Sequence, residues 1–295
     1  MPEPSPAHRP VFDLGAIGAA LQELSAQWAA GKSFGAGASG DPEEVARHML
    51  EGYAYVDGLL ARDLDPFVYG GSRLLLEMNH QVLCGAGTRR RAEFARHLAA
   101  TERRFYDDHQ CGADAFYAMV ARSRHLKPIP FAARIYRQIV EAPQLFIEGN
   151  QRTATLVASF VLGRAGLPPM VPTAKTFGAL SVLSATCKAM DRRWFLSMAW
   201  GWMLDLQMQN FIMRTAQADF LADKAALPPP SVPPAATSSA TGAPGQASAS
   251  QRSPGHPWAN NSQARKTPAH KTWTGRSRAD HAFTDNTWGR GAPAG

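Results

Sequence analysis

Five consecutive residues carry groups that can bind a phosphate and a divalent cation: Glu148, Gly149, Asn150, Gln151 and Arg152. They stand at the start of a segment with helical periodicity, where the first backbone N–H groups lack intrahelical acceptors and attract an anion. An arginine in the first turn opposes the helix dipole, so Arg152 indicates a negatively charged ligand. Glu148 offers the hard oxygen that Mg²⁺ takes together with substrate phosphates. The run therefore predicts a cradle for a metal-bound nucleotide or another phosphate.

The segment after this run has the pattern of a buried helix of about four turns. Gly166 stands where that helix should end, and Pro168-Pro169 prevents its continuation. The apolar positions that recur at helical spacing are Leu156, Val157, Phe160, Val161 and Leu162.

The stretch from Gln144 to Thr155, QLFIEGNQRTAT, resembles the signature of the Fic (Fido) family, HPFx[DE]GNGRxxR in one-letter code. The resemblance implies an all-helical fold in which the signature loop precedes a buried helix. It also implies transfer of AMP, or another phosphate-containing group, from a nucleotide to a hydroxyl of a target protein. The implied cofactors are ATP or another nucleotide, with Mg²⁺.

The resemblance assigns a role to each matching position. Phe146 would anchor the loop in the core, and Glu148 would be the Mg²⁺ carboxylate. Gly149 and Asn150 would belong to the anion-binding loop, and Arg152 would contact phosphate. The plainer interpretation of GNxR at a helix start is a turn, with glycine at positive φ and asparagine as cap.

The chain departs from the family signature at Gln144, Leu145, Gln151 and Thr155. Gln144 replaces the general-base histidine, and an amide cannot accept a proton near neutral pH, which forfeits about 10²–10⁴-fold in rate. Gln151 replaces a loop glycine that lets phosphate approach, and Thr155 replaces a second phosphate arginine. The sequence thus predicts nucleotide binding with impaired or altered transfer. The alternative is an inactive Fic-fold scaffold that binds a partner protein.

The charge is concentrated in the C-terminal tail. The chain has 31 Lys and Arg, 24 Asp and Glu and a net charge of +7. Seven of those basic residues, against two acidic ones, lie in residues 227–295, which are rich in Pro, Ala and Ser and cannot bury enough apolar surface to fold. A scattered basic tail is typical of a solvated coil, so nucleic-acid binding is not expected. Trp258, Trp273 and Trp288 are either partner anchors or neutral features of this tail.

The three cysteines, Cys84, Cys111 and Cys187, are far apart and have no metal-binding spacing, which indicates a reducing compartment. No apolar run reaches the roughly 18 residues of a membrane span. The most apolar window, residues 194–204, is too short and is interpreted as part of a buried helix. We therefore expect a cytoplasmic protein without a membrane anchor.

No convincing strand pattern occurs, so the predicted fold class is all-α. The expected domains are residues 1–40, an N-terminal helix and Gly-rich linker; 41–226, a Fic-like helical domain of about seven or eight helices; and 227–295, a disordered basic tail. Expected helices span 13–30, 41–60, 72–84, 88–106, 113–126, 131–142, 150–166, 173–189 and 192–222.

Overall fold

The computed structural model describes residues 11–31, 41–68, 70–190 and 195–222, with the backbone alone at 195–199. The chain divides into two compact units, Met1–Ser231 with Trp288–Gly295, and Val232–Thr287. All described residues belong to the first unit. The Gly-rich linker after residue 31 and the tail after residue 222, with its three tryptophans, lie outside the described residues.

The described chain is all-α, as the sequence predicts. It contains ten α-helices and one short 3-10 helix, Ala218–Phe220, and an isolated bridge is its only β pairing. None of these helices has the length and apolar character needed to cross a membrane. The α-helices are α1 Leu14–Ala29, α2 Pro42–Ala61, α3 Ser72–Cys84, α4 Thr88–Glu93, α5 Ala95–Asp107, α6 Ala113–Ser123, α7 Pro128–Val140, α8 Asn150–Arg164, α9 Phe177–Ala189 and α10 Phe195–Thr215.

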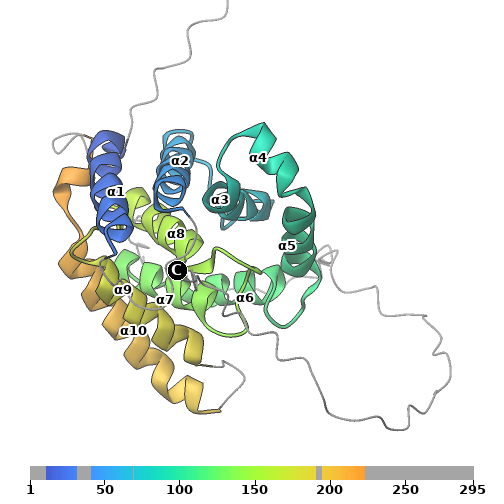
Figure 1. Ribbon diagram of the computed structural model, residues 1–295. Coiled ribbons are helices and arrows are strands. Elements are labelled where there is room, and N and C mark those ends of the chain that lie inside the picture. Colours follow the sequence, from blue (N-terminus) through green and yellow to red (C-terminus); the bar gives the residue numbers. More distant parts are fainter. Residues whose placement is uncertain (1–10, 32–40, 69, 191–194, 223–295) are drawn as a thin grey trace, which may run out of the picture. The chain divides into compact units, whose positions relative to one another are not determined.

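Helix α8 is the centre of the core. Every residue from Thr153 to Gly163 is buried, so this stretch of α8 is enclosed on all sides. Helices α2 and α3 pack on one side of α8 and α7 packs on the other (Figure 1). The helix ends at Arg164, and Gly166 follows with a φ of 72°, which is the stop that the sequence predicts.

The two ends of the described chain meet beside α2. Phe12 and Leu221 form the antiparallel bridge, and the N–H of Asp13 donates to the carbonyl of Phe220 at 2.9 Å. The carboxylate of Asp57 on α2 accepts from the N–H groups of Val11 and Phe12. These bonds hold α1 against the rest of the unit, so α1 can form one wall of a pocket.

Helix α10 is fixed to α7 by an ion network. Asp205 is 3% exposed and accepts hydrogen bonds from Arg134 and from Arg137, each at 2.6 Å. Arg137 also pairs with Glu141, which is 1% exposed. A buried carboxylate needs such cationic partners to offset its desolvation.

Three sequence predictions about helices are wrong in detail. The segment 88–106 breaks at Phe94 into α4 and α5, where the Arg90 guanidinium lies 4.7 Å from the centre of the Phe94 ring. Helix α7 begins at Pro128 rather than at residue 131, because proline fits the first turn of a helix, where its missing N–H costs nothing. The apolar window 194–204 is not wholly buried, since Trp200 and Trp202 are exposed. Residues 41–226 therefore contain nine described α-helices, against the seven or eight expected there.

Candidate functional site

The loop between α7 and α8 is held by an aromatic anchor. Phe146 is fully buried and its ring stacks on Phe105 of α5, with ring centres 5.4 Å apart and an angle of 17° between planes. Arg104 on the same helix donates to the backbone carbonyl of Gln144 at 2.8 Å. Helix α5 therefore sets the position of the loop that enters α8.

Asn150 closes this loop on itself. Its side-chain oxygen accepts from the N–H of Phe146 at 2.8 Å, and its side-chain nitrogen donates to the carbonyl of Phe146 at 2.8 Å and to Gln144 Oε1 at 3.3 Å. Asn150 is 4% exposed, so water has little access to these groups. Its side chain therefore supplies the hydrogen bonds that the N–H and the carbonyl of Phe146 would otherwise lack. Asn150 thus shapes the loop, and any ligand must bind through neighbouring groups.

Gly149 turns the chain into α8. Its φ is 73°, and a Cβ atom there would lie 3.1 Å from Asn79 Nδ2 and 3.2 Å from side-chain carbons of Val82 and Leu83. The first backbone bond of α8 runs from the N–H of Thr153 to the carbonyl of Gly149. The preceding N–H groups of the helix are therefore free of intrahelical acceptors, which gives this end a positive potential.

Arg152 brings a cation to the same end of α8. One guanidinium nitrogen donates to the carbonyl of Val82, in the last turn of α3, at 2.7 Å. Desolvation lowers the pKa of this guanidinium, against the opposite effect of Glu148 and Glu44. No carboxylate among the described residues lies within ion-pair distance of Arg152. The charge is therefore only partly compensated by the protein.

A pocket of about 160 Å³ opens beside Arg152, between α1, α2, α8 and α9. Its walls are largely apolar, Arg152 and Lys188 supply its charges, and no carboxylate lines it. This combination suits an anionic ligand with an apolar body. The lining comprises Leu21, Leu24, Ser25, Trp28, Pro42, Val45, Ala46, Met49, Gly149, Asn150, Gln151, Arg152, Thr155, Pro172, Phe177, Leu180 and Lys188.

Two of the four residues that depart from the signature, Gln151 and Thr155, also line this pocket. Gln151 is partly buried, and Thr155 is buried with its hydroxyl donating to the carbonyl of Gln151 at 2.9 Å. The threonine side chain is shorter than that of arginine, and its hydroxyl is already bonded within its own helix. Thr155 therefore cannot replace a guanidinium that would contact a distal phosphate. These two substitutions leave one loop-side cation, Arg152, to bind an anion.

Glu148 lies apart from the pocket. Its side chain is 59% exposed and lies 3.8 Å from Nε2 of His97, on α5. Its backbone carbonyl accepts from Asn79 at 2.9 Å. The described residues contain no group of three or more His, Cys, Asp or Glu side chains that could hold a metal. The Glu148 carboxylate is a suitable Mg²⁺ ligand by type. However, no carboxylate lines the pocket beside Arg152, so the described residues do not fit a metal–phosphate complex there.

Gln144 has no titratable proton to exchange and is tied into the loop. Its side-chain nitrogen donates to the carbonyl of Val140 at 3.2 Å, and its oxygen accepts from Asn150. Of the other histidines, His109 is 86% exposed beside Asp114, and His80 lies 3.8 Å from Glu77. His97, the imidazole beside Glu148, was not predicted. It is about fifty residues upstream of the loop, and no local sequence pattern connects the two.

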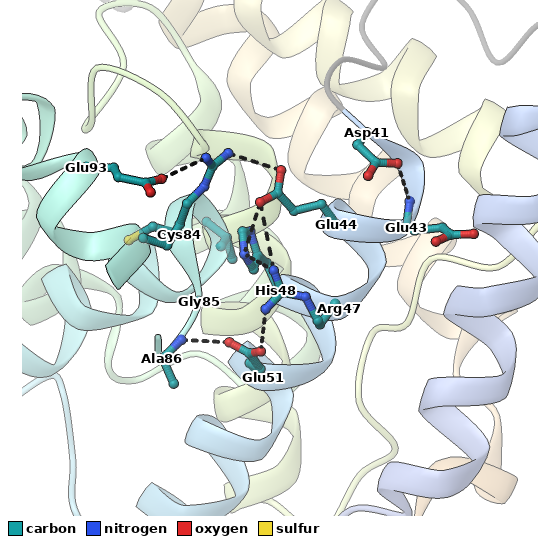
Figure 2. Close-up of polar contacts among 12 residues, drawn as sticks. Asp41, Glu43, Glu44, Arg47, His48, Glu51, Cys84, Gly85, Ala86 and Glu93 are labelled. Atoms are coloured by element: carbon teal, nitrogen blue, oxygen red, sulfur yellow. Dashed lines mark hydrogen bonds and ion pairs between the residues drawn. The ribbon is translucent and has the colours of Figure 1, made fainter. Parts of the chain in front are cut away.

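A charged cluster on α2 fixes the turn between α3 and α4 (Figure 2). Glu44 lies within ion-pair distance of Arg47 and of Arg90, and Arg47 pairs with Glu51 at 2.9 Å. The other oxygen of Glu51 accepts from the N–H of Ala86 at 2.6 Å. Because α3 also supplies the carbonyl that holds Arg152, this cluster stabilises one side of the site.

His48 is the buried member of that cluster. Its side chain is 2% exposed, and Nε2 lies 3.0 Å from an Arg47 nitrogen and 3.9 Å from Glu44. Burial and the charge of Arg47 lower the pKa of His48, with Glu44 and Glu51 acting in the opposite direction. These effects together favour the neutral form of the imidazole. This cluster was not predicted from the sequence, although Glu44 to His48 and Arg47 to Glu51 have the i,i+4 spacing of helical pairs.

The sequence matches no protein-family model and no curated protein.

Proposed function

We propose that this chain is a Fic-like protein that binds the phosphate of a nucleotide at the N-terminus of α8 and whose group transfer is impaired. The observation that carries the proposal is Arg152. Arg152 lines the pocket, its guanidinium is desolvated, and no carboxylate of the described chain lies within ion-pair distance of it. An anion there would offset the cost of that charge, and the free N–H groups of α8 would add hydrogen bonds.

The pocket also limits how the ligand binds. Its volume of about 160 Å³ is below the roughly 300–1,000 Å³ of pockets that enclose small molecules. It can hold one phosphate and part of an apolar or planar body, while the remainder of a nucleotide lies in solvent. Trp28 and Phe177 supply aromatic surface for that body.

The residues of the loop then have distinct roles. Arg152 binds and orients the phosphate, Gly149 lets the backbone turn toward it, and Asn150 preserves the loop geometry. Gln144 cannot take the proton of an attacking hydroxyl. A hydroxyl of a target protein would therefore be a poor nucleophile at this site. Glu148 lies apart from the pocket, so the proposed phosphate binding does not depend on Mg²⁺.

Ligand-induced thermal stabilisation tests the proposal. The full chain is heated with AMP, ADP, ATP or inorganic phosphate, with and without Mg²⁺, beside Arg152→Gln and the exposed control Arg122→Gln. A ligand at 100 times its Kd stabilises by about 2.7 kcal/mol, several degrees in Tm. We expect that shift in the native chain and in Arg122→Gln, without a need for Mg²⁺, and its loss in Arg152→Gln. Equal shifts in all three proteins, or none with any nucleotide, would refute the proposal.

Transfer activity is tested separately by restoring the missing groups. Gln144→His supplies the base, and Gln151→Gly with Thr155→Arg restores the remaining signature positions. We expect labelled nucleotide to be transferred to protein faster by the restored variant than by the native chain. If binding is intact but the restored variant remains inactive, the impaired-enzyme part of the proposal fails while phosphate binding stands.

A second candidate, a non-catalytic scaffold that binds a partner protein, is favoured by the internal bonding of the loop. Gln144, Asn150 and Arg152 each make a hydrogen bond within the protein, as a purely structural loop requires. This candidate predicts no nucleotide-dependent shift in Tm and no effect of Arg152→Gln on partner binding.

A further inference from the structure

A second cavity lies at the C-terminal end of α8, where residues 160, 161, 164 and 165 line it. Its volume is about 330 Å³, within the roughly 300–1,000 Å³ of pockets that enclose a small molecule. It shares no lining residue with the pocket beside Arg152, which contacts α8 only at residues 150–152 and 155. A ligand in this cavity therefore meets a different set of side chains.

The inner wall of the cavity is aromatic and buried. Phe67 and Phe160 are 7% and 1% exposed, and their ring centres lie 5.9 Å apart in an edge-to-face arrangement. The ring of Phe131, in the first turn of α7, lies 5.7 Å from that of Phe67 and is only partly buried. Leu126 and Val161 add aliphatic surface. This wall suits an aromatic ring or a short aliphatic chain.

The loop that carries Phe67 is held in place by hydrogen bonds. The N–H of Phe67 donates to Oδ1 of Asp65 at 2.7 Å, and its carbonyl accepts from Arg124 at the end of α6. The hydroxyl of Tyr117, also on α6, donates to the carbonyl of Pro66 at 2.7 Å. The cavity is therefore preformed, so a ligand does not bear the cost of ordering this loop.

Three charged side chains line the cavity, and one of them is left without an ionic partner. Asp65 accepts from Phe67 through one oxygen and pairs with Arg164 at 2.7 Å through the other. Arg164 also lies 3.6 Å from the exposed carboxylate of Asp63. Arg124, by contrast, has no ion-pair partner among the described residues, and its guanidinium bonds only to the Phe67 carbonyl. It retains free N–H donors and an uncompensated positive charge.

We propose that this cavity binds a small carboxylate with an aromatic or short aliphatic body. The carboxylate pairs with Arg124, and the body lies against Phe67, Phe131 and Phe160. This site is additional to the proposed nucleotide site and does not depend on it.

The charges of the lining favour a monoanionic carboxylate over other ligands. One uncompensated cation matches one negative charge. A dianionic phosphate would bring a second charge that no further free cation in the lining compensates. The ammonium group of an amino acid would find Asp65 already bonded through both oxygens. The cavity should therefore bind hydrocinnamate more tightly than L-phenylalanine, which differs from it by that ammonium group.

Ligand-observed NMR tests the proposal on the full chain, with hydrocinnamate as the probe. We expect saturation transfer from the protein to the ring protons of the probe, with a Kd in the millimolar range or below, as a ligand of this size gives. Hydrocinnamide has nearly the same shape without the charge and should bind about ten-fold more weakly. Absence of saturation transfer to hydrocinnamate, or equal affinities for the acid and the amide, would overturn the proposal.

Matched variants locate the binding. Arg124→Gln should weaken hydrocinnamate binding by about ten-fold. Arg122→Gln removes an exposed arginine two residues away that does not line the cavity, and Arg152→Gln alters the other pocket, so both should bind the probe as the native chain does. Native affinity in Arg124→Gln, or loss of affinity in Arg152→Gln, would overturn the assignment to this cavity.

A second variant is needed because Arg124 also holds the loop of Phe67. Ala165 lines the cavity and is only partly buried, so Ala165→Phe places a ring in the space without removing a hydrogen-bonding side chain. This variant should keep the native circular dichroism and lose hydrocinnamate binding. A folded Ala165→Phe chain that binds the probe with native affinity would also overturn the proposal. Nucleotide-induced stabilisation, measured in parallel, should be unchanged in this variant, which separates a failure of this site from a failure of the site at Arg152.

Discussion

Arg152 donates to the carbonyl of Val82, 2.7 Å away, and so joins the first turn of α8 to the last turn of α3. The C-terminal carbonyls of a helix attract a cation. Arg152 is also one of the residues that line the pocket, so the residue proposed to bind phosphate also joins two helices.

Replacing Arg152 with Met should lower the free energy of unfolding by about 1–2 kcal/mol. The lost bond leaves the Val82 carbonyl without this donor, while removal of a desolvated charge partly offsets that cost. Urea unfolding followed by circular dichroism measures the difference, with Arg122→Met as the exposed control. A loss above about 4 kcal/mol would mean that Arg152 is strongly paired with Glu148 or Glu44, contrary to the geometry.

Asn150→Ala should destabilise the chain by about 2–4 kcal/mol, because it leaves the buried N–H and carbonyl of Phe146 unpaired. Gln110→Ala removes an exposed amide and should change the unfolding free energy by less than about 0.5 kcal/mol. The urea midpoints of the two variants provide the comparison. Similar midpoints would show that the Asn150 bonds are replaced by water and do not hold the loop.

Gly149→Ala and Gly178→Ala should have opposite effects on stability. At Gly149, a positive φ and Cβ contacts of 3.1–3.2 Å make alanine unfavourable, and we expect a loss of about 1–3 kcal/mol. At Gly178, in α9, nothing lies within 4 Å of an added Cβ, so alanine should gain up to about 1 kcal/mol. Thermal unfolding of both variants measures the contrast. A neutral Gly149→Ala would mean that the loop relaxes freely, and the proposed N-terminal anion site would lose its fixed geometry.

The features that could be predicted from the sequence are those set by neighbouring residues. The start of α8 at Gly149 and its end near Gly166 follow from local backbone preferences. The start of α7 was placed three residues too late, at residue 131, because proline both precedes and begins helices and only the packing of α7 decides which. The exposure of Trp202 was missed because composition shows that a helix is apolar without showing which side another helix covers.

The same distinction, between features set by neighbouring residues and features set by packing, applies to the candidate site. The loop residues from Gln144 to Thr155 are contiguous, so their types could be interpreted together. His97 and Val82 come to the loop only through the packing of α5 and α3, and no spacing along the chain connects them to it. Lys188 likewise lines the pocket from α9, a helix that follows the loop in sequence by about 25 residues.

His48 should make the protein less stable as the pH falls. Burial and Arg47 hold its pKa in the folded state below the ordinary value of 6.5, so the unfolded chain takes up a proton first. Stability is therefore full above pH 6.5 and is lost as the pH falls from 6.5 toward the lower pKa of the folded state. Burial lowers the pKa of His80 as well, which adds a loss in the same direction.

The expected result is a smaller loss of stability between pH 7.5 and pH 5 in His48→Gln than in the native chain. Urea midpoints at several pH values measure this, and His109→Gln, which alters an imidazole that is 86% exposed, should retain the native pH dependence. If His48→Gln is folded at pH 7.5 yet keeps that dependence, His80 or the carboxylates must account for the acid sensitivity. In that case the ion pairs of Glu44 and Glu51, rather than the buried imidazole, would determine how the turn between α3 and α4 responds to acid.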